Sequence, residues 1–296
     1  MRFYCPFLVV AILTSLVSQS SGLTMSNGPE LPINVVTGFG VIVRGDIGTA
    51  HNLNLLVDTG AVPSVLNENV ARKLMDKSVW AEVANACDWH SYGSDHTIRV
   101  PYVNVHSIRV GPAFKSKLPM VLVDLRQLGR SLHIRVDAIL GMDFFEPQSF
   151  SIDYKRKKLV LGLSEHATHT LKAEVTRSVG APYWIVPIAL NSNRIRLLLD
   201  TGTDSVTLFS GRALHLLSES RHETTAFTLT GQQALETAQV SALTFGGMQF
   251  RHRPVYIRPE SPNGLPKLDG LFGPRSLGLT VVAFDWEHQT LNWGTD

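Results

Sequence analysis

The stretch Leu55-Leu56-Val57-Asp58-Thr59-Gly60-Ala61 has a close counterpart in Leu197-Leu198-Leu199-Asp200-Thr201-Gly202-Thr203. In both copies an apolar run leads into an aspartate, a threonine and a glycine. An apolar run of this length next to a turn residue is typical of a buried strand. The two copies therefore predict two buried strands, each of which delivers an aspartate into a tight turn.

The match between the two copies continues well beyond these stretches. At a constant offset of 132 residues, Asp137, Ile139, Leu140 and Gly141 correspond to Asp269, Leu271, Phe272 and Gly273. At the same offset, Asp153, Tyr154, Leu159 and Gly162 correspond to Asp285, Trp286, Leu291 and Gly294. Two copies with matching flanks are typical of an internal repeat, so the sequence predicts two similar lobes.

Strand signals dominate the rest of the chain. The 296 residues are 44% hydrophobic and 18% charged, as in an ordinary globular protein. Short runs of Val, Ile, Leu and Phe recur between Gly, Pro, Asn and Asp clusters, for example at 41–43, 98–105 and 120–123. The pattern predicts an all-β fold. Short helices are expected at 67–75, 142–145, 210–217 and 274–277.

Residues 1–22 have the layout of a secretory signal. Arg2 precedes an apolar stretch from Phe7 to Val17, and small and polar residues follow. The alternative is a buried N-terminal strand or helix. We predict a signal peptide over 1–22, a first lobe over 23–165, a polar linker over 166–180 and a second lobe over 181–296. Secretion or export to a periplasm follows from this interpretation.

The net charge and the cysteine content argue against several kinds of partner and cross-link. Removing 1–22 takes away one basic and no acidic residue, so the formal net charge falls from +2 to +1 and gives no reason to expect nucleic acid. Cys87 would then be the sole cysteine, without a disulfide. The basic cluster at 155–158 is matched by Glu287-His288-Gln289-Thr290, which favours a hairpin turn over a polyanion site.

The paired aspartates point to acid–base chemistry. Each glycine permits a turn that brings backbone N–H groups close to the preceding carboxylate. If a pseudo-two-fold axis relates the copies, the two turns meet, and two carboxyls in contact share one proton. One acid and one base result. The base can activate a water, and the acid can hydrogen-bond a substrate carbonyl.

On these residues the chain resembles the two-lobed aspartic proteases of the pepsin and retropepsin type. The resemblance rests on Asp58-Thr59-Gly60-Ala61 with Ile139-Leu140-Gly141, and on Asp200-Thr201-Gly202-Thr203 with Leu271-Phe272-Gly273. It implies that Asp58 and Asp200 are the catalytic pair and that Thr59 and Thr201 interlock between the lobes. Gly60, Gly202 and Thr203 would support the pair, and each apolar-apolar-Gly element would pack beside its aspartate in a psi-shaped loop.

The resemblance also implies a β-hairpin flap over the substrate. Tyr92 and Gly93 match the flap tip of pepsin-like chains, although they follow Asp58 more closely than in those chains. Gly231 occupies a comparable place in the second copy and could belong to a second flap. The chain departs from pepsin in lacking its disulfides, and the segment from Leu23 to Gly38 is too short to resemble its inhibitory prosegment.

The sequence therefore predicts a monomeric aspartic endopeptidase that binds an extended peptide between two β-barrel-like lobes. We expect no cofactor. We also expect no metal, because the histidines are not part of a Cys/His metal-binding motif. Ser64 has no nucleophile elbow, which argues against serine hydrolysis. Asp137 and Asp269 are expected to be structural. The alternatives are an inactive two-lobed peptide-binding scaffold and, with less support, a glycoside hydrolase. After signal removal no membrane-spanning segment is expected.

Overall fold

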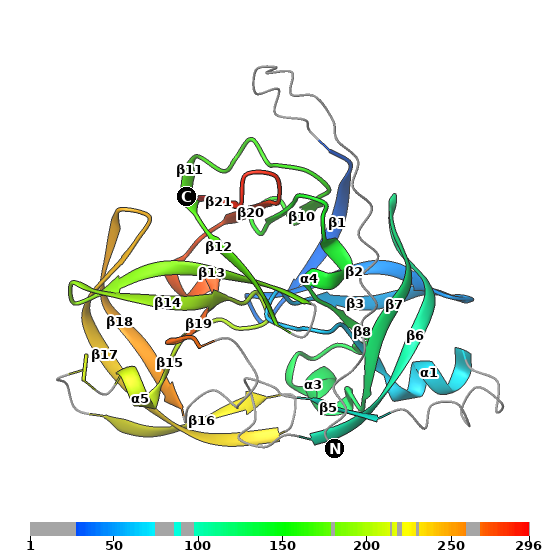
Figure 1. Ribbon diagram of the computed structural model, residues 1–296, viewed down its shortest axis with the longest axis horizontal. Coiled ribbons are helices and arrows are strands. Elements are labelled where there is room, and N and C mark those ends of the chain that lie inside the picture. The colour runs from blue at the N-terminus through cyan, green and yellow to red at the C-terminus, as the bar shows by residue number, and fades with distance from the viewer. Residues whose placement is uncertain are drawn as a thin grey trace.

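The computed structural model describes residues 28–74, 86–89, 98–178, 181–213, 215–217, 221–228, 231–258 and 267–295. Strands make up most of these residues, in two sheets of 13 and 8 strands. Figure 1 shows two lobes, the first in blue to green and the second in yellow-green to orange. The predicted all-β fold with two lobes is confirmed. The predicted signal peptide lies outside the described residues.

Within the described residues, the first lobe is a closed arrangement of strands with three short helices. Its sheet order is β1-β2-β3-β8-β4-β7-β6-β5, and a further pairing between β2 and β6 closes the barrel. The strands are β1 (Glu30–Val36), β2 (Gly40–Ile47), β3 (Ala50–Val57), β4 (Val65–Asn67), β5 (Ala86–Trp89), β6 (Ile98–Val110), β7 (Ala113–Val123) and β8 (Ala138–Leu140). The helices are α1 (Glu68–Leu74), α3 (Arg126–Ser131) and α4 (Met142–Phe145).

The second lobe repeats this plan. Its order is β12-β13-β14-β19-β15-β18-β17-β16, and β13 also pairs with β17. The strands are β12 (Glu174–Ser178), β13 (Ala181–Leu190), β14 (Asn193–Leu199), β15 (Val206–Phe209), β16 (His222–Thr228), β17 (Gly231–Phe245), β18 (Met248–Arg258) and β19 (Gly270–Phe272). The helical segments are α5 (Ser210–Ala213) and the 3₁₀ turn η1 (Pro274–Leu277). The same closing pairing in each lobe matches the duplication seen in the sequence.

Strands from both lobes form a shared sheet in the order β11-β21-β20-β9-β10-β1. It adds β9 (Phe150–Asp153), β10 (Lys158–Val160), β11 (His169–Lys172), β20 (Val281–Asp285) and β21 (Thr290–Gly294). The join between the lobes is the antiparallel pair β9 and β20, in which Phe150 lies opposite Phe284. Figure 1 shows these strands above the two barrels. The shared sheet fixes the lobes relative to one another by backbone hydrogen bonds.

Aromatic packing reinforces that join. The ring of Phe150 stacks on Phe145 with a centroid separation of 4.0 Å and on Phe284 with a separation of 4.6 Å. Trp184 meets Phe284 edge-on at 5.3 Å. All four side chains are buried in one apolar core that extends through both lobes. Burial of this much aromatic surface holds the two barrels in a defined orientation.

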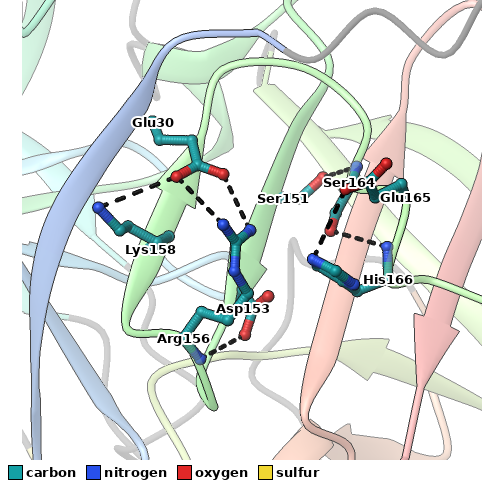
Figure 2. A network of polar contacts seen from close by, with 8 residues as sticks. All are labelled: Glu30, Ser151, Asp153, Arg156, Lys158, Ser164, Glu165 and His166. Atoms are coloured by element: carbon teal, nitrogen blue, oxygen red, sulfur yellow. Dashed lines mark hydrogen bonds and ion pairs between the residues drawn. The ribbon is translucent and has the colours of Figure 1, made fainter.

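The hairpin between β9 and β10 contains the basic cluster. Arg156 donates its backbone N–H to Asp153 Oδ1 at 2.7 Å, and its guanidinium lies 2.9 Å from Glu30 on β1. Figure 2 shows Glu30 also reaching Lys158. The predicted hairpin turn is confirmed. His288 donates its N–H to Asp285 Oδ1 at 3.0 Å in the equivalent turn of the second copy.

The helices and the linker differ from expectation in extent. Asn67 Oδ1 accepts the N–H of Asn69 at 3.1 Å and so caps α1. The helix expected at 210–217 is shorter, because α5 ends at Ala213. The segment 166–180, expected to be a linker, carries β11, which pairs with β21, and β12, which pairs with β13. Its polar sequence fits edge strands, which are buried on one side at most.

Candidate active site

Strand β3 ends next to Asp58 and places it where the two lobes meet. Leu55 and Val57 pack into the large core, and Leu56 packs into a second cluster on the other face of the strand. This alternation buries both faces, which explains the uninterrupted apolar run. The same holds for Leu197, Leu198 and Leu199 on β14.

The apolar-apolar-Gly elements form the strands beside the aspartates. β8 lies between β3, to which it runs parallel, and β4, to which it runs antiparallel, and β19 lies in the same way between β14 and β15. Asp58 donates its N–H to Leu140 O at 3.0 Å, and Asp200 donates its N–H to Phe272 O at 2.9 Å. Ile139 and Leu271 occupy the preceding positions on β8 and β19.

Both elements end in a glycine for a steric reason. A Cβ on Gly141 would lie 1.9 Å from Ala61 O, and a Cβ on Gly273 would lie 2.2 Å from Thr203 O. No side chain fits against a carbonyl at that separation. The two glycines therefore let β8 and β19 press against the chain that leaves each aspartate turn.

The two threonines join the lobes through reciprocal hydrogen bonds. The Thr59 hydroxyl donates to Leu199 O at 2.8 Å and accepts the N–H of Thr201 at 3.1 Å. The Thr201 hydroxyl donates to Val57 O at 3.2 Å and accepts the N–H of Thr59 at 3.0 Å. Both threonines are completely buried. Each hydroxyl thus uses its donor and an acceptor across the lobe interface, which locks the two turns together.

The two carboxyl groups face one another. A Cβ on Gly60 would lie 2.5 Å from Asp200 Cγ, and a Cβ on Gly202 would lie 2.6 Å from Asp58 Cγ. Each carboxyl therefore rests on the glycine of the opposite turn, where only a hydrogen fits. The two carboxyls are also hydrogen-bonded to each other. The turns that the sequence places 142 residues apart are in contact in the fold.

Contact between two acids raises their proton affinity. Burial raises the pKa of Asp58 above its ordinary value, and hydrogen bonds from Asp200, Gly60 and Ala61 oppose that rise. Burial also raises the pKa of Asp200 well above its ordinary value, the charge of Asp58 adds to the rise, and the Gly202 N–H and the charge of Arg258 oppose it. Two like charges in contact cannot both persist near neutral pH, so the pair titrates as a unit.

The backbone donors around the two acids are unequal. Asp58 Oδ1 accepts the N–H of Gly60 at 2.9 Å and that of Ala61 at 3.1 Å. Asp200 Oδ1 accepts the N–H of Gly202 at 2.8 Å, and among the described residues it accepts no second backbone N–H. Backbone N–H donors stabilise the ionised form. The arrangement favours the charge on Asp58 and the proton on Asp200.

A second pair of aspartates supports the site from behind. Asp137 Oδ2 accepts the N–H of Asn54 at 2.9 Å, and Asp269 Oδ2 accepts the N–H of Arg196 at 2.8 Å. Asn54 and Arg196 lie four residues before Asp58 and Asp200 on β3 and β14. These contacts fit the structural role expected for Asp137 and Asp269, which fix the strands that carry the facing acids.

The remaining predicted site residues are Tyr92, Gly93, Gly231 and Thr203. Tyr92 and Gly93 lie outside the described residues, in the loop between β5 and β6, which pair with each other. Gly231 begins β17 and pairs with Thr228 at the end of the hairpin formed with β16. Thr203 supports its turn through Ser205, since their hydroxyl oxygens lie 3.0 Å apart.

Sequence reasoning missed two charged residues behind the turns. Asp143 on α4 accepts hydrogen bonds from Ser64, at 2.8 Å from the backbone N–H and 2.5 Å from the hydroxyl. Arg275 on η1 occupies the matching position in the second copy, where it donates to Leu279 O at 2.8 Å and to Gly38 O of the first lobe at 3.2 Å. The repeat gave no signal here, because the two copies carry opposite charges at this position.

The described residues cover most of both lobes. There, no group of three or more His, Cys, Asp or Glu side chains is arranged to hold a metal ion. No helix within those same ranges has the length and apolar character that a membrane crossing needs.

Comparison with known proteins identifies the family. The profile of the aspartyl protease family matches residues 41–144 and 186–274, which is more than half of the chain. The chain belongs to the aspartyl protease family. The two matched stretches contain the two aspartate turns and both glycine elements, so the family match covers the whole site.

The fold of this family member is also found in a solved structure. The crystal structure of the aspartic proteinase from Irpex lacteus superposes with a TM-score of 0.51 at 14% sequence identity. The match covers 90% of this chain and 97% of that one. No curated protein sequence matches this chain.

Proposed function

We propose that this aspartyl protease family member is an active aspartic endopeptidase that uses Asp58 and Asp200 as its catalytic pair. The observation that carries the proposal is the contact between the two carboxyls, each resting on the glycine of the opposite turn. A contact of this kind gives one acid and one base from two identical side chains. An inactive scaffold would have no use for two aspartates that burial and mutual repulsion make costly.

The proposed reaction begins with a water held between the acids. Ionised Asp58 takes a proton from the water, whose oxygen forms a bond to the peptide carbonyl carbon. Asp200 gives its proton to the carbonyl oxygen, which produces a neutral tetrahedral diol. The C–N bond then breaks as Asp58 returns a proton to the departing nitrogen, and Asp200 recovers a proton from the collapsing diol. The pair ends with one proton, as it began.

The proposed roles of the two acids follow from their donors. Asp58 is the base because two backbone N–H groups stabilise its charge. Asp200 is the acid because, among the described residues, only the Gly202 N–H donates to its carboxyl from the backbone. The threonine lock keeps the acids in register during the reaction, because any separation of the lobes breaks four hydrogen bonds at once.

The substrate is proposed to be an extended peptide. β5 and β16 are the end strands of their sheets, so each has an unpaired edge within the described residues. An extended peptide can add to such an edge through backbone hydrogen bonds, while its side chains enter pockets on either side. The proposed flaps are the β5–β6 and β16–β17 hairpins, with Tyr92 and Gly93 in the first and Gly231 in the second.

The test is a mixed-peptide digestion with wild type, Asp58→Asn and Asp200→Asn. Each variant should lose activity by about 10²- to 10⁴-fold or more, because each removes either the base or the acid. Asp46→Asn is the matched control, since Asp46 is half-buried and, among the described contacts, bonds within its own hairpin to Asn52 and His51. Cleavage retained in either dyad variant would refute the assignment.

A pepstatin-like transition-state mimic distinguishes the competing scaffold role. The active enzyme should bind the mimic and be inhibited by it. Peptide binding without cleavage under any pH would favour the scaffold. If the protein does not cleave peptide and does not bind the mimic, the proposed function has no support.

We also propose that the protein is exported and works as a monomer. The proposal rests on the charge and hydropathy layout of residues 1–22. A host that exports the full chain should release a product whose N-terminus is near Leu23, as determined by N-terminal sequencing. Retention of residues 1–22 in the secreted product would contradict it. Sedimentation of the product as a dimer would contradict the monomer.

A further inference from the structure

The inference concerns Asp143, which the proposed reaction does not use. Asp143 lies on α4, directly behind the first aspartate turn, and burial raises the pKa of its carboxyl. Three donors converge on this carboxyl: Ser64 N–H at 2.8 Å, the Ser64 hydroxyl at 2.5 Å and Phe144 N–H at 3.0 Å. Every one of these partners donates to Asp143. Such a set matches an acceptor-only carboxylate.

The contacts continue from Asp143 toward Asp58. Ser64 is completely buried, and its hydroxyl oxygen accepts the N–H of Gly141 at 2.9 Å. Gly141 packs against Ala61 O so closely that a Cβ there would lie 1.9 Å away. Ala61 in turn donates its N–H to Asp58 Oδ1 at 3.1 Å. An unbroken series of contacts thus joins Asp143, Ser64, Gly141 and Ala61 to the proposed base.

The second lobe lacks this series. Gly273 donates its N–H to the backbone carbonyl of Ser205 at 2.8 Å, where the first lobe uses a side-chain hydroxyl. Arg275 stands at the position of Asp143 and directs its guanidinium away, toward Gly38 and Leu279. The turn with the carboxylate behind it is also the one whose aspartate holds two backbone N–H donors.

We propose that Asp143 is a positioning residue that holds Ala61 N–H on Asp58 and thereby keeps the negative charge of the pair on Asp58. It acts through Ser64 and Gly141 and does not touch the substrate. The inference rests on the proposed function, since it assigns a role within that same catalytic pair. The charged and titratable groups that act on or feel Asp143 are Lys115, on β7, and Tyr183, on β13.

The decisive experiment compares the pH dependence of kcat/KM in wild type, Asp143→Asn, Ser64→Ala and Ser64→Thr. Loss of the Ala61 hydrogen bond makes ionisation of Asp58 harder. The acid limb should therefore move to higher pH by about half to one unit in Asp143→Asn and Ser64→Ala, because one unit corresponds to the loss of one charge-assisted hydrogen bond. Ser64→Thr keeps the hydroxyl and should restore the limb toward its wild-type position.

At the pH optimum of wild type, Asp143→Asn and Ser64→Ala should lower kcat by about tenfold and leave KM unchanged, because only the chemical step is affected. Thr170→Val is the matched control. It removes another hydroxyl hydrogen bond, 2.6 Å long, from Thr170 on the exposed strand β11 to Asn292, and it should leave the profile unmoved.

A purely structural role gives a different result. In that case Asp143→Asn would lower the melting temperature while the pH profile stayed superimposable on that of wild type, and the proposal would be wrong. Lys115→Gln tests the proposal even if the substitutions of Asp143 and Ser64 prevent folding. It leaves the hydrogen bonds to Asp143 in place and removes the charge that stabilises Asp143, so a smaller shift of the acid limb in the same direction is expected, and no shift would count against the proposal.

Failure of the proposed function would look different again. If wild type cleaves no peptide and binds no pepstatin-like mimic, the catalytic assignment fails. If wild type cleaves and the variants keep its pH profile, only the role of Asp143 fails.

Discussion

The two aspartate turns share a backbone plan and differ in the groups that stand behind them. In both turns, a strand buried on two faces leads into the aspartate, and the threonine forms hydrogen bonds with the other lobe. The glycine of each turn packs against the carboxyl of the opposite aspartate. Behind Asp58 stands the acceptor Asp143, and behind Asp200 stands the cation Arg275. The residues that fix the geometry of the turns are present in both copies. The charged residues behind the turns, Asp143 and Arg275, differ between the copies.

This difference suggests how a symmetric site can give its two acids unlike roles. Identical carboxyls in identical surroundings would share the proton equally. Here burial raises the pKa of both acids, and a second backbone donor reaches Asp58 alone among the described contacts. Small differences suffice, because one pKa unit corresponds to only about 1.4 kcal/mol.

The largest expected effect tests what the turns have in common. Gly60→Ala and Gly202→Ala each place a methyl group less than 3 Å from the opposite carboxyl carbon, which must move away. We expect each variant to lose peptide cleavage by about 10²-fold or more, since a displacement of about 1 Å has that cost. Digestion assays at matched folded fraction measure it. Equal losses would show that both glycines serve the same contact, and wild-type activity in either variant would contradict the geometry.

The threonine lock gives the next largest effect. Thr59→Val and Thr201→Val each leave a buried N–H and a buried carbonyl without partners in the other lobe, which should lower the free energy of unfolding by about 1–3 kcal/mol. The double variant should lose less than the sum, because the two hydroxyls serve one interlobe network. Chemical denaturation of the four proteins tests this. Strict additivity would mean that the threonines act independently.

The unequal backbone donors of the two acids, both of which have a raised pKa, predict unequal effects on stability. An acid with a raised pKa in the folded state binds more protons folded than unfolded, so stability falls as the pH rises from its unfolded pKa to its folded one. Asp200→Asn removes that penalty. It should raise the melting temperature at pH 7 more than Asp58→Asn does, and the advantage should disappear below about pH 4. Thermal scans across pH test the sign; equal gains would make the acids equivalent.

A smaller effect is expected at Arg275, which occupies in the second lobe the position that Asp143 occupies in the first. Its guanidinium lies 5.3 Å from the ring centroid of Tyr154 and donates across the lobe interface to Gly38 O. Arg275→Met should lower the free energy of unfolding by about 1–2 kcal/mol and leave the pH profile of cleavage in place. A shifted acid limb in this variant would place Arg275 in the same electrostatic role as Asp143.

The sequence predicted the parts of the molecule that are repeated. Two copies of an apolar run before an aspartate indicate two buried strands, and the offset between Gly141 and Gly273 located the elements that pack beside them. The contact between Asp58 and Asp200 could be expected from the repeat alone, because a pseudo-two-fold axis brings equivalent turns together.

The parts that differ between the copies could not be predicted. Asp143 and Arg275 occupy equivalent positions with opposite charges, so the comparison of copies gives no pattern. Their roles depend on partners distant in sequence, Ser64 and Gly38, which only the fold brings close. The sequence predicts a linker where β11 and β12 lie, because an edge strand exposed to solvent needs no sustained apolar pattern.

The central claim is that Asp58 and Asp200 titrate as one pair with the charge held on Asp58. Titration of the two carboxyls by carbon-13 NMR, in wild type and in Asp58→Asn, measures this directly. We expect two coupled steps in wild type, the upper one well above the ordinary value of 3.8, with Asp58 ionising first, and a single step from Asp200 in the variant. Two independent titrations near 3.8 in wild type would contradict the account.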